Sequence, residues 1–132
     1  MLELNQTTTK TFSDLPPHWS LSVRFDVIVI NANNWSTSYL KIYLDSVLQA
    51  TYTYQNNYFW KICSNADNLI LYNKNLTTHT KTSITVSINA DTSQDTFIKG
   101  ILLRNFFLYV DTCDISCATC NGPTNVRTFL FF

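Results

Sequence analysis

The 132-residue chain has only two glycines and few charged side chains. Gly100 and Gly122 are too far apart to form a glycine-rich loop of the kind that binds phosphate groups. Basic and acidic residues number nine each, so the net charge is zero. Nucleic acids and anionic membranes bind basic surfaces, so the sequence predicts neither as a partner. No run reaches the roughly 18 apolar residues of a membrane helix, so no membrane span is expected within the chain.

The sequence also offers little for catalysis. The chain has two histidines, His18 and His79, and neither lies in a nucleophile motif, so we expect both to be structural. The acidic residues are scattered singly. Asp45, Asp91 and Asp95 could approach a calcium ion, but they lack EF-hand spacing, and solvated loop acids are the favoured interpretation. We therefore predict a protein that is not an enzyme and has no metal or other cofactor, with calcium as the one alternative left open.

Alternation of apolar and polar residues with a period of two is the clearest pattern present. It runs through Trp19–Val29, Tyr39–Asp45 and Ile84–Asn89, and a helix cannot use such a period. Further strands are predicted at Asn68–Tyr72 and Phe97–Val110. With intervening Asn- and Thr-rich turns, these runs predict an all-β fold of seven or eight strands. The expected architecture is an antiparallel β-sandwich of the jelly-roll kind with a short cysteine-rich tail at its C-terminal end.

Several local features refine this prediction. Asp45-Ser46 is expected to be the tight turn of a hairpin, although it lacks an Asn-Gly or Asp-Gly signature. Gly100 is expected to mark a β-bulge. We predict that Ile28 and Ile30 are buried on the second face of their strand. Residues 73–80 are expected to form a polar loop, and residues 1–13 a polar arm or edge strand.

The four cysteines bear on the cellular compartment. Cys63 stands alone, whereas Cys113, Cys117 and Cys120 cluster within eight residues. Zinc sites usually supply two close pairs, or cysteines followed by histidine, and neither arrangement occurs here. Disulfides in an oxidising compartment are therefore favoured over a metal site. Four cysteines allow three pairings, which the sequence by itself leaves open.

Three N-x-S/T sequons, at Asn5, Asn34 and Asn75, agree with glycosylation in that compartment. A chain rich in Asn and Thr also makes sequons by chance. The N-terminal residues show no basic segment followed by an apolar one, as a signal peptide would. The expectation is an extracellular or cell-surface protein, represented by a fragment or by an incomplete gene model.

The cysteine cluster, Cys113-x3-Cys117-x2-Cys120-Asn-Gly-Pro, resembles the opening of a furin-like, growth-factor-receptor-type cysteine-rich repeat. The preceding region resembles a β-sandwich module that comes before such repeats in large protist surface proteins. The pieces that carry this second resemblance are Leu15-Pro-Pro-His18, Cys63 before an Asp, His79 before the Ile84 strand, and Arg104-Asn-Phe-Phe-Leu-Tyr109.

The resemblance implies a β-sandwich domain over residues 1–112 and a truncated repeat over residues 113–132. It also implies a bond between Cys63 and Cys113, with partners for Cys117 and Cys120 in a continuation that this chain lacks. The chain departs from the repeat at its end, where Phe129–Phe132 replaces further cysteines. This apolar end either packs on the sandwich or is foreign sequence read past an exon boundary, and the second alternative is slightly favoured.

The functional expectation is a non-catalytic extracellular or cell-surface recognition or adhesion module. Its expected partner is a glycan or a neighbouring surface protein. Trp35, in an Asn-rich loop, is the best candidate to stack on a sugar, although an anchor folded onto the core is the commoner role for such a residue. The alternatives are a purely structural spacer and a fragment of a carbohydrate-active enzyme, which would need two catalytic carboxylates in one concave sheet.

Overall fold

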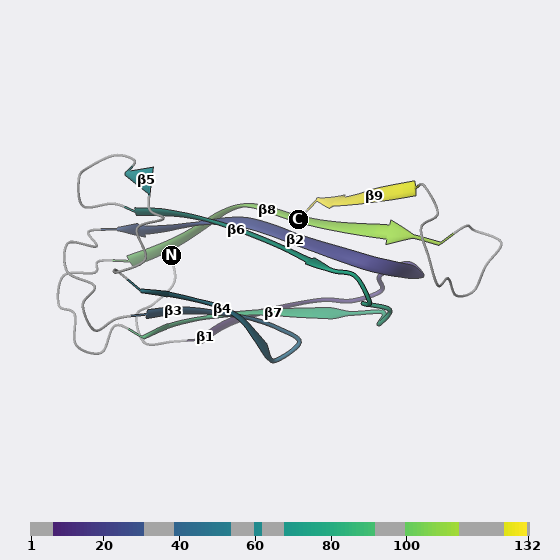
Figure 1. The fold of residues 1–132 in the computed structure, drawn as a ribbon, viewed down its shortest axis with the longest axis horizontal. Coiled ribbons are helices and arrows are strands. Elements are labelled where there is room, and N and C mark those ends of the chain that lie inside the picture. The colour runs from purple at the N-terminus through teal and green to yellow at the C-terminus, as the bar shows by residue number, and fades with distance from the viewer. Residues whose placement is uncertain are drawn as a thin grey trace.

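The computed structural model describes residues 7–30, 39–53, 60–61, 68–91, 100–113 and 126–131, and they contain no helix. One sheet has the order β1 (Thr7–Phe12), β7 (Ile84–Asp91), β3 (Tyr39–Leu44) and β4 (Val47–Thr53). The other has the order β5 (Trp60–Lys61), β6 (Asn68–Leu76), β2 (His18–Ile30), β8 (Gly100–Thr112) and β9 (Val126–Phe131). All described strand pairs are antiparallel, and the two sheets lie as two layers in Figure 1. The expectation of an all-β chain built from antiparallel strands is confirmed.

Strand β2 is central because it pairs with both β6 and β8. Its alternating residues from Leu21 to Val29 are fully buried, as the period-two pattern predicts. Trp19, which shares their parity, is only half-buried, because the register with β8 shifts between His18 and Ser20. Ile28 and Ile30 are half-buried rather than fully buried on the second face, so that part of the prediction is wrong.

One hydrophobic cluster joins the two sheets. A row of aromatic rings runs through it, from Phe12 on β1 to Phe106 on β8, Phe25 on β2 and Tyr72 on β6, with ring centroids 5.0, 5.6 and 4.8 Å apart in turn. Full burial of such a side chain contributes about 1.5–3 kcal/mol. Because Phe12 belongs to the four-stranded sheet and the other three rings to the five-stranded sheet, this row ties the two layers together.

Strand β6 is longer than the sequence predicts. Asn73–Leu76 was expected to open a polar loop, but it continues the strand and pairs with Leu21–Arg24 of β2. A long neighbouring strand supplies hydrogen-bonding partners for these backbone groups, and that tertiary pairing overrides the turn preference of asparagine.

The bulge lies at Asn105 and not at Gly100, which pairs regularly with Ile30. Arg24 is paired with Phe107 and Asp26 with Arg104, so Phe25 lies opposite two residues of β8. Asn105 adopts a φ of 51°, in the left-handed region that Asn tolerates better than most residues. Before the extra residue, the inward-facing residues of β8 are Ile101 and Leu103. After it, they are Phe106, Leu108 and Val110.

The predicted hairpin between β3 and β4 is confirmed. Both turn residues have positive φ, 48° for Asp45 and 66° for Ser46, as in the two-residue turns that match the twist of hairpin strands. β1 forms an edge of its sheet, in agreement with the polar edge strand expected near the N-terminus.

The apolar C-terminal segment forms strand β9 of the five-stranded sheet. β9 pairs with β8 from Thr112↔Val126 to Phe107↔Phe131. The backbone of this apolar end therefore belongs to the five-stranded sheet.

Candidate functional site

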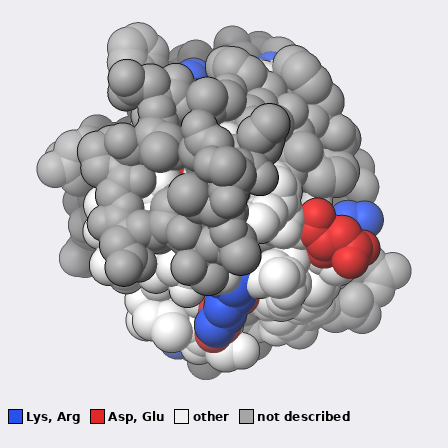
Figure 2. Space-filling view, turned by 90° about the vertical axis from the view of Figure 1, so that its right-hand side faces the viewer, with Lys and Arg blue, Asp and Glu red and all other residues white. Residues whose placement is uncertain are grey.

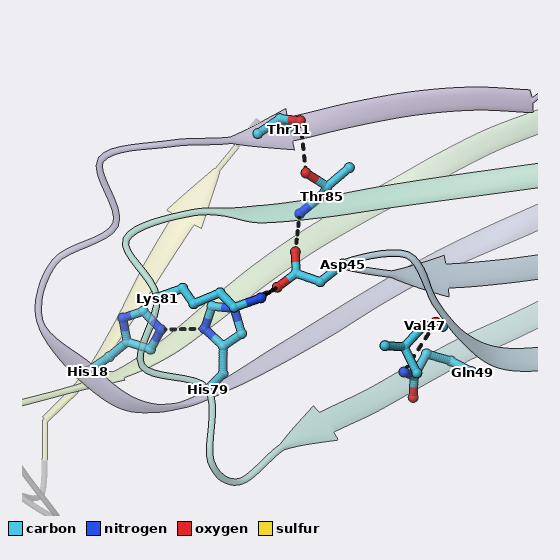
Figure 3. Close-up of polar contacts among 8 residues, drawn as sticks. All are labelled: Thr11, His18, Asp45, Val47, Gln49, His79, Lys81 and Thr85. Atoms are coloured by element: carbon cyan, nitrogen blue, oxygen red, sulfur yellow. Dashed lines mark hydrogen bonds and ion pairs between the residues drawn. The ribbon is translucent and has the colours of Figure 1, made fainter.

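Two polar clusters and an apolar groove are features of the described residues that could carry a function. The first cluster joins His18 at the start of β2, His79 and Lys81 in the connection from β6 to β7, and Asp45 in the β3–β4 turn (Figure 3). The two histidines are buried, with exposed fractions of 3% and 8%. Their rings are stacked with centroids 5.1 Å apart.

The hydrogen bonds constrain the tautomers of the two rings. His18 Nδ1 lies 2.6 Å from the carbonyl oxygen of Pro16, which can only accept, so Nδ1 carries the hydrogen. In neutral His18, Nε2 must then accept the bond from His79 Nδ1, 2.8 Å away. With both rings neutral, His79 Nε2 carries a lone pair, and it lies 3.5 Å from a carboxylate oxygen of Asp45. This nitrogen is buried and has no hydrogen-bonding partner among the described residues.

Asp45 connects three elements. Its Oδ1 accepts the backbone N–H of Thr85 at 2.9 Å, and its Oδ2 accepts Lys81 Nζ at 3.0 Å. Burial acts to raise the pKa of Asp45, but the Thr85 N–H, Lys81 and His79 act the other way, and the pKa is lowered overall. The carboxylate is therefore charged at neutral pH and bound by groups of its own chain.

Burial lowers the pKa of His79, and the nearby His18 adds to this effect, whereas Asp45 opposes it. Pro16, the partner ring and Asp45 are polar contacts of the two rings in the described part of the chain. In the part of the chain that the structure describes, no group of three or more His, Cys, Asp or Glu side chains could hold a metal ion. The arrangement links three connections of the fold through hydrogen bonds and an ion pair.

The groove lies between the edges of the two sheets and has a volume of about 410 Å³. Its walls come from β1 and β7 on one side and from β8 on the other. Its apolar lining is made by Phe12, Val86, Ile88, Leu103 and Phe106. A volume in this range suits a small-molecule ligand.

The second polar cluster lies beside this groove. Asp26 on β2 is 5% exposed, and its Oδ2 accepts Asn105 Nδ2 at 2.6 Å and Arg104 Nε at 3.3 Å. Arg104 and Asn105 also line the groove. A buried carboxylate needs such partners, so Asp26 holds the bulge of β8 against β2 and fixes one rim of the groove.

The structure describes only some of the sites predicted from the sequence. Asn75 is exposed on β6, and its amide oxygen accepts a hydrogen bond from Ser22 at 3.3 Å. Cys113 is buried and disulfide-bonded. The other predicted sites lie outside the described residues: Trp35, Asn5, Asn34, Cys63, Cys117, Cys120 and Asp95.

Sequence reasoning missed both polar clusters. His18 and His79 are 61 positions apart, and nothing in the local pattern of either one pointed to the other. The sequence around Asp26 could have indicated a polar contact, because a carboxylate flanked by Phe25 and Val27 in a central strand needs a partner. The identity of that partner depended on the bulge, which the sequence did not locate.

Figure 2 shows the end of the molecule where the connections between β1 and β2 and between β6 and β7 lie, and its charged side chains form small separate clusters among uncharged atoms. The described part of the chain holds no helix with the length and hydrophobicity that a membrane crossing requires. Comparison of the chain with protein-family models, with curated proteins and with solved structures finds no match.

Proposed function

We propose that the two sheets form a jelly-roll-like β-sandwich that serves as a non-catalytic recognition or adhesion module outside the cytoplasm. The observation that carries the proposal is the disulfide at Cys113, which is 8% exposed. Its backbone N–H also donates to the carbonyl oxygen of Pro17 at 2.9 Å, next to the start of β2. Disulfides persist in oxidising compartments, so a buried one at the end of a central strand supports an extracellular or cell-surface protein.

The pairing that the cysteine-rich resemblance implies, Cys63 with Cys113, belongs to this proposal. So does the idea that residues from Cys113 onward open a truncated furin-like repeat. The exposed Asn75 supports glycosylation at that sequon, because its amide nitrogen lies on a strand face open to solvent. Glycosylation and disulfide formation occur together in secreted chains.

We propose that loops on a rigid scaffold bind the ligand, which is a glycan or a neighbouring surface protein. Two sheets joined by one core supply such a scaffold. Trp35 remains our candidate contact with a sugar ring. Among the described side chains, the carboxylate next to the groove, Asp26, is already bound by Arg104 and Asn105, which favours binding over acid–base chemistry there.

The compartment is tested by secreting the chain from a eukaryotic host and mapping its peptides without reduction. A linked peptide pair containing Cys63 and Cys113, and a glycan on Asn75, are the expected results. A free Cys113 thiol or stoichiometric zinc in the purified protein would refute the disulfide assignment.

The recognition role is tested with a glycan array and the Trp35→Ala variant. Loss of binding with little change in stability is expected if Trp35 contacts the ligand. Trp19→Ala is the matched control, because Trp19 is half-buried in β2 and its removal should lower stability without a specific loss of binding. If Trp35→Ala instead costs about 3 kcal/mol or more of stability and no glycan binds, the spacer role is the better account.

A further inference from the structure

We propose that the groove between β1, β7 and β8 is a binding site for an amphipathic anion, a small molecule with a carboxylate joined to an apolar chain. The proposal is independent of glycan recognition and would stand if no glycan bound.

The position of the groove follows from the sheet edges. β1 is the edge of the four-stranded sheet, and β9 covers β8 only from Phe107 to Thr112. Over residues 100–106, β8 therefore has no described neighbour beyond it in its sheet. Two strand edges face each other there, and no further strand among the described residues closes the space between them.

The side chains of β1 show that this opening is polar at its mouth and apolar inside. Thr8, Lys10 and Phe12 alternate along β1 and all line the groove. Phe12 is buried, whereas Thr8 and Lys10 are exposed although they lie on the inward face of the strand. An inward-pointing lysine on an edge strand keeps its amine in water while its stem covers apolar surface.

A cation, Lys10, borders the apolar lining on the inward face. Lys10 Nζ lies 5.9 Å from the centre of the Phe12 ring and has no carboxylate partner among the described residues. Arg104 pairs with Asp26 in the register of β8 and β2 and binds that carboxylate through Nε, so its side chain lies on the outer face of the sheet, away from the apolar lining. Its side chain is 44% exposed. No carboxylate is among the described residues that line the groove, so the charge at its rim is positive.

The chemistry of the occupant follows from this distribution. Lys10 suits a carboxylate, with the Thr8 hydroxyl nearby as a further polar group. Leu103 and the rings of Phe12 and Phe106 suit an apolar chain. A neutral sugar would leave Lys10 without a partner, and a cation would be repelled by it.

Binding is tested by isothermal titration calorimetry of the full chain with dodecanoate below its micelle concentration. Dodecanol serves as the neutral probe of equal chain length. We expect dodecanoate to bind at least about tenfold more tightly than dodecanol, because a charge-assisted contact is worth roughly that factor. Its affinity should also fall as salt is added. No heat and no saturable binding of dodecanoate by the wild type would overturn the proposal, and so would equal affinity for the two probes.

Matched variants locate the site. Lys10→Met keeps the apolar stem and should weaken dodecanoate binding about tenfold. Lys41→Met is its control, because Lys41 also lies over a ring, Tyr39 at 4.3 Å, but on the outer face of the same sheet. Equal effects of the two variants would refute a role for Lys10.

Leu103→Trp should fill the groove and abolish binding, whereas Leu102→Trp changes the neighbouring residue on the opposite, exposed face and should not. Circular dichroism melts establish that each variant folds. If Leu103→Trp does not fold, Thr8→Trp at the exposed groove mouth gives the same test. Unchanged dodecanoate binding in a folded groove-filling variant would place the ligand elsewhere and refute the proposal.

Discussion

Replacement of Asn105 should separate two contributions that this residue makes to stability. One is its backbone conformation, with a φ of 51° at the bulge of β8. The other is its side-chain hydrogen bond of 2.6 Å to Asp26, a carboxylate that is 5% exposed. The Asn105→Gly variant can keep the φ of 51° but lacks the hydrogen bond to Asp26. The Asn105→Ala variant lacks the same hydrogen bond and also disfavours that φ. The pair of variants therefore measures each contribution by difference.

The magnitudes follow from the two mechanisms. Hydrogen bonds to charged groups contribute about 1.5–3 kcal/mol, so Asn105→Gly should lower the free energy of unfolding by about 2 kcal/mol. A residue with a Cβ in the left-handed region costs roughly 1 kcal/mol more, so Asn105→Ala should cost about 3 kcal/mol. Arg104 still contacts the carboxylate at 3.3 Å in both variants, which keeps the loss below that of an unpaired buried charge.

Urea denaturation at pH 7, followed by tryptophan fluorescence, measures these values. Asn73→Ala on β6 is the control, because Asn73 is an exposed strand residue, and its replacement should change stability by less than about 0.5 kcal/mol. In an Asp26→Asn background the cost of Asn105→Gly should shrink, since the charged acceptor is gone. Equal losses for the glycine and alanine variants, or a loss in the glycine variant no larger than the control, would refute the reasoning.

Four further outcomes are expected. Because burial lowers the pKa of His79 below its ordinary 6.5, the unfolded chain takes up the proton more readily. The free energy of unfolding should therefore fall as the pH drops below about 6.5, and His79→Gln should flatten this dependence between pH 7 and 5. Phe25→Ala should cost about 3–5 kcal/mol in urea denaturation, because the ring is fully buried and packs against two others. Ser46→Gly should raise the melting temperature by stabilising the fold by up to about 1 kcal/mol, because Ser46 has a φ of 66°, and a lower melting temperature would contradict this. Cys113→Ser should cost about 2–5 kcal/mol by removing the disulfide, and unchanged stability would refute a structural role for that bond.

The sequence by itself determined the fold class and the main buried face. From Leu21 to Val29 the alternation is regular, and a strand with that period can bury only one set of residues. It also determined the β3–β4 hairpin, because two apolar alternating runs flank the two residues Asp45 and Ser46. These features depend on neighbouring residues alone, so no knowledge of distant partners was needed.

Tertiary structure decided the rest, because the remaining features depend on which segments become neighbours. Asn73–Leu76 is a strand only because β2 lies beside it. The bulge fell at Asn105 because Asp26 on the adjacent strand binds its side chain there, whereas Gly100 needed no bulge. His79 contacts His18 because the connection from β6 to β7 lies beside the start of β2. Long-range pairing creates these contacts, and local periodicity carries no information about it.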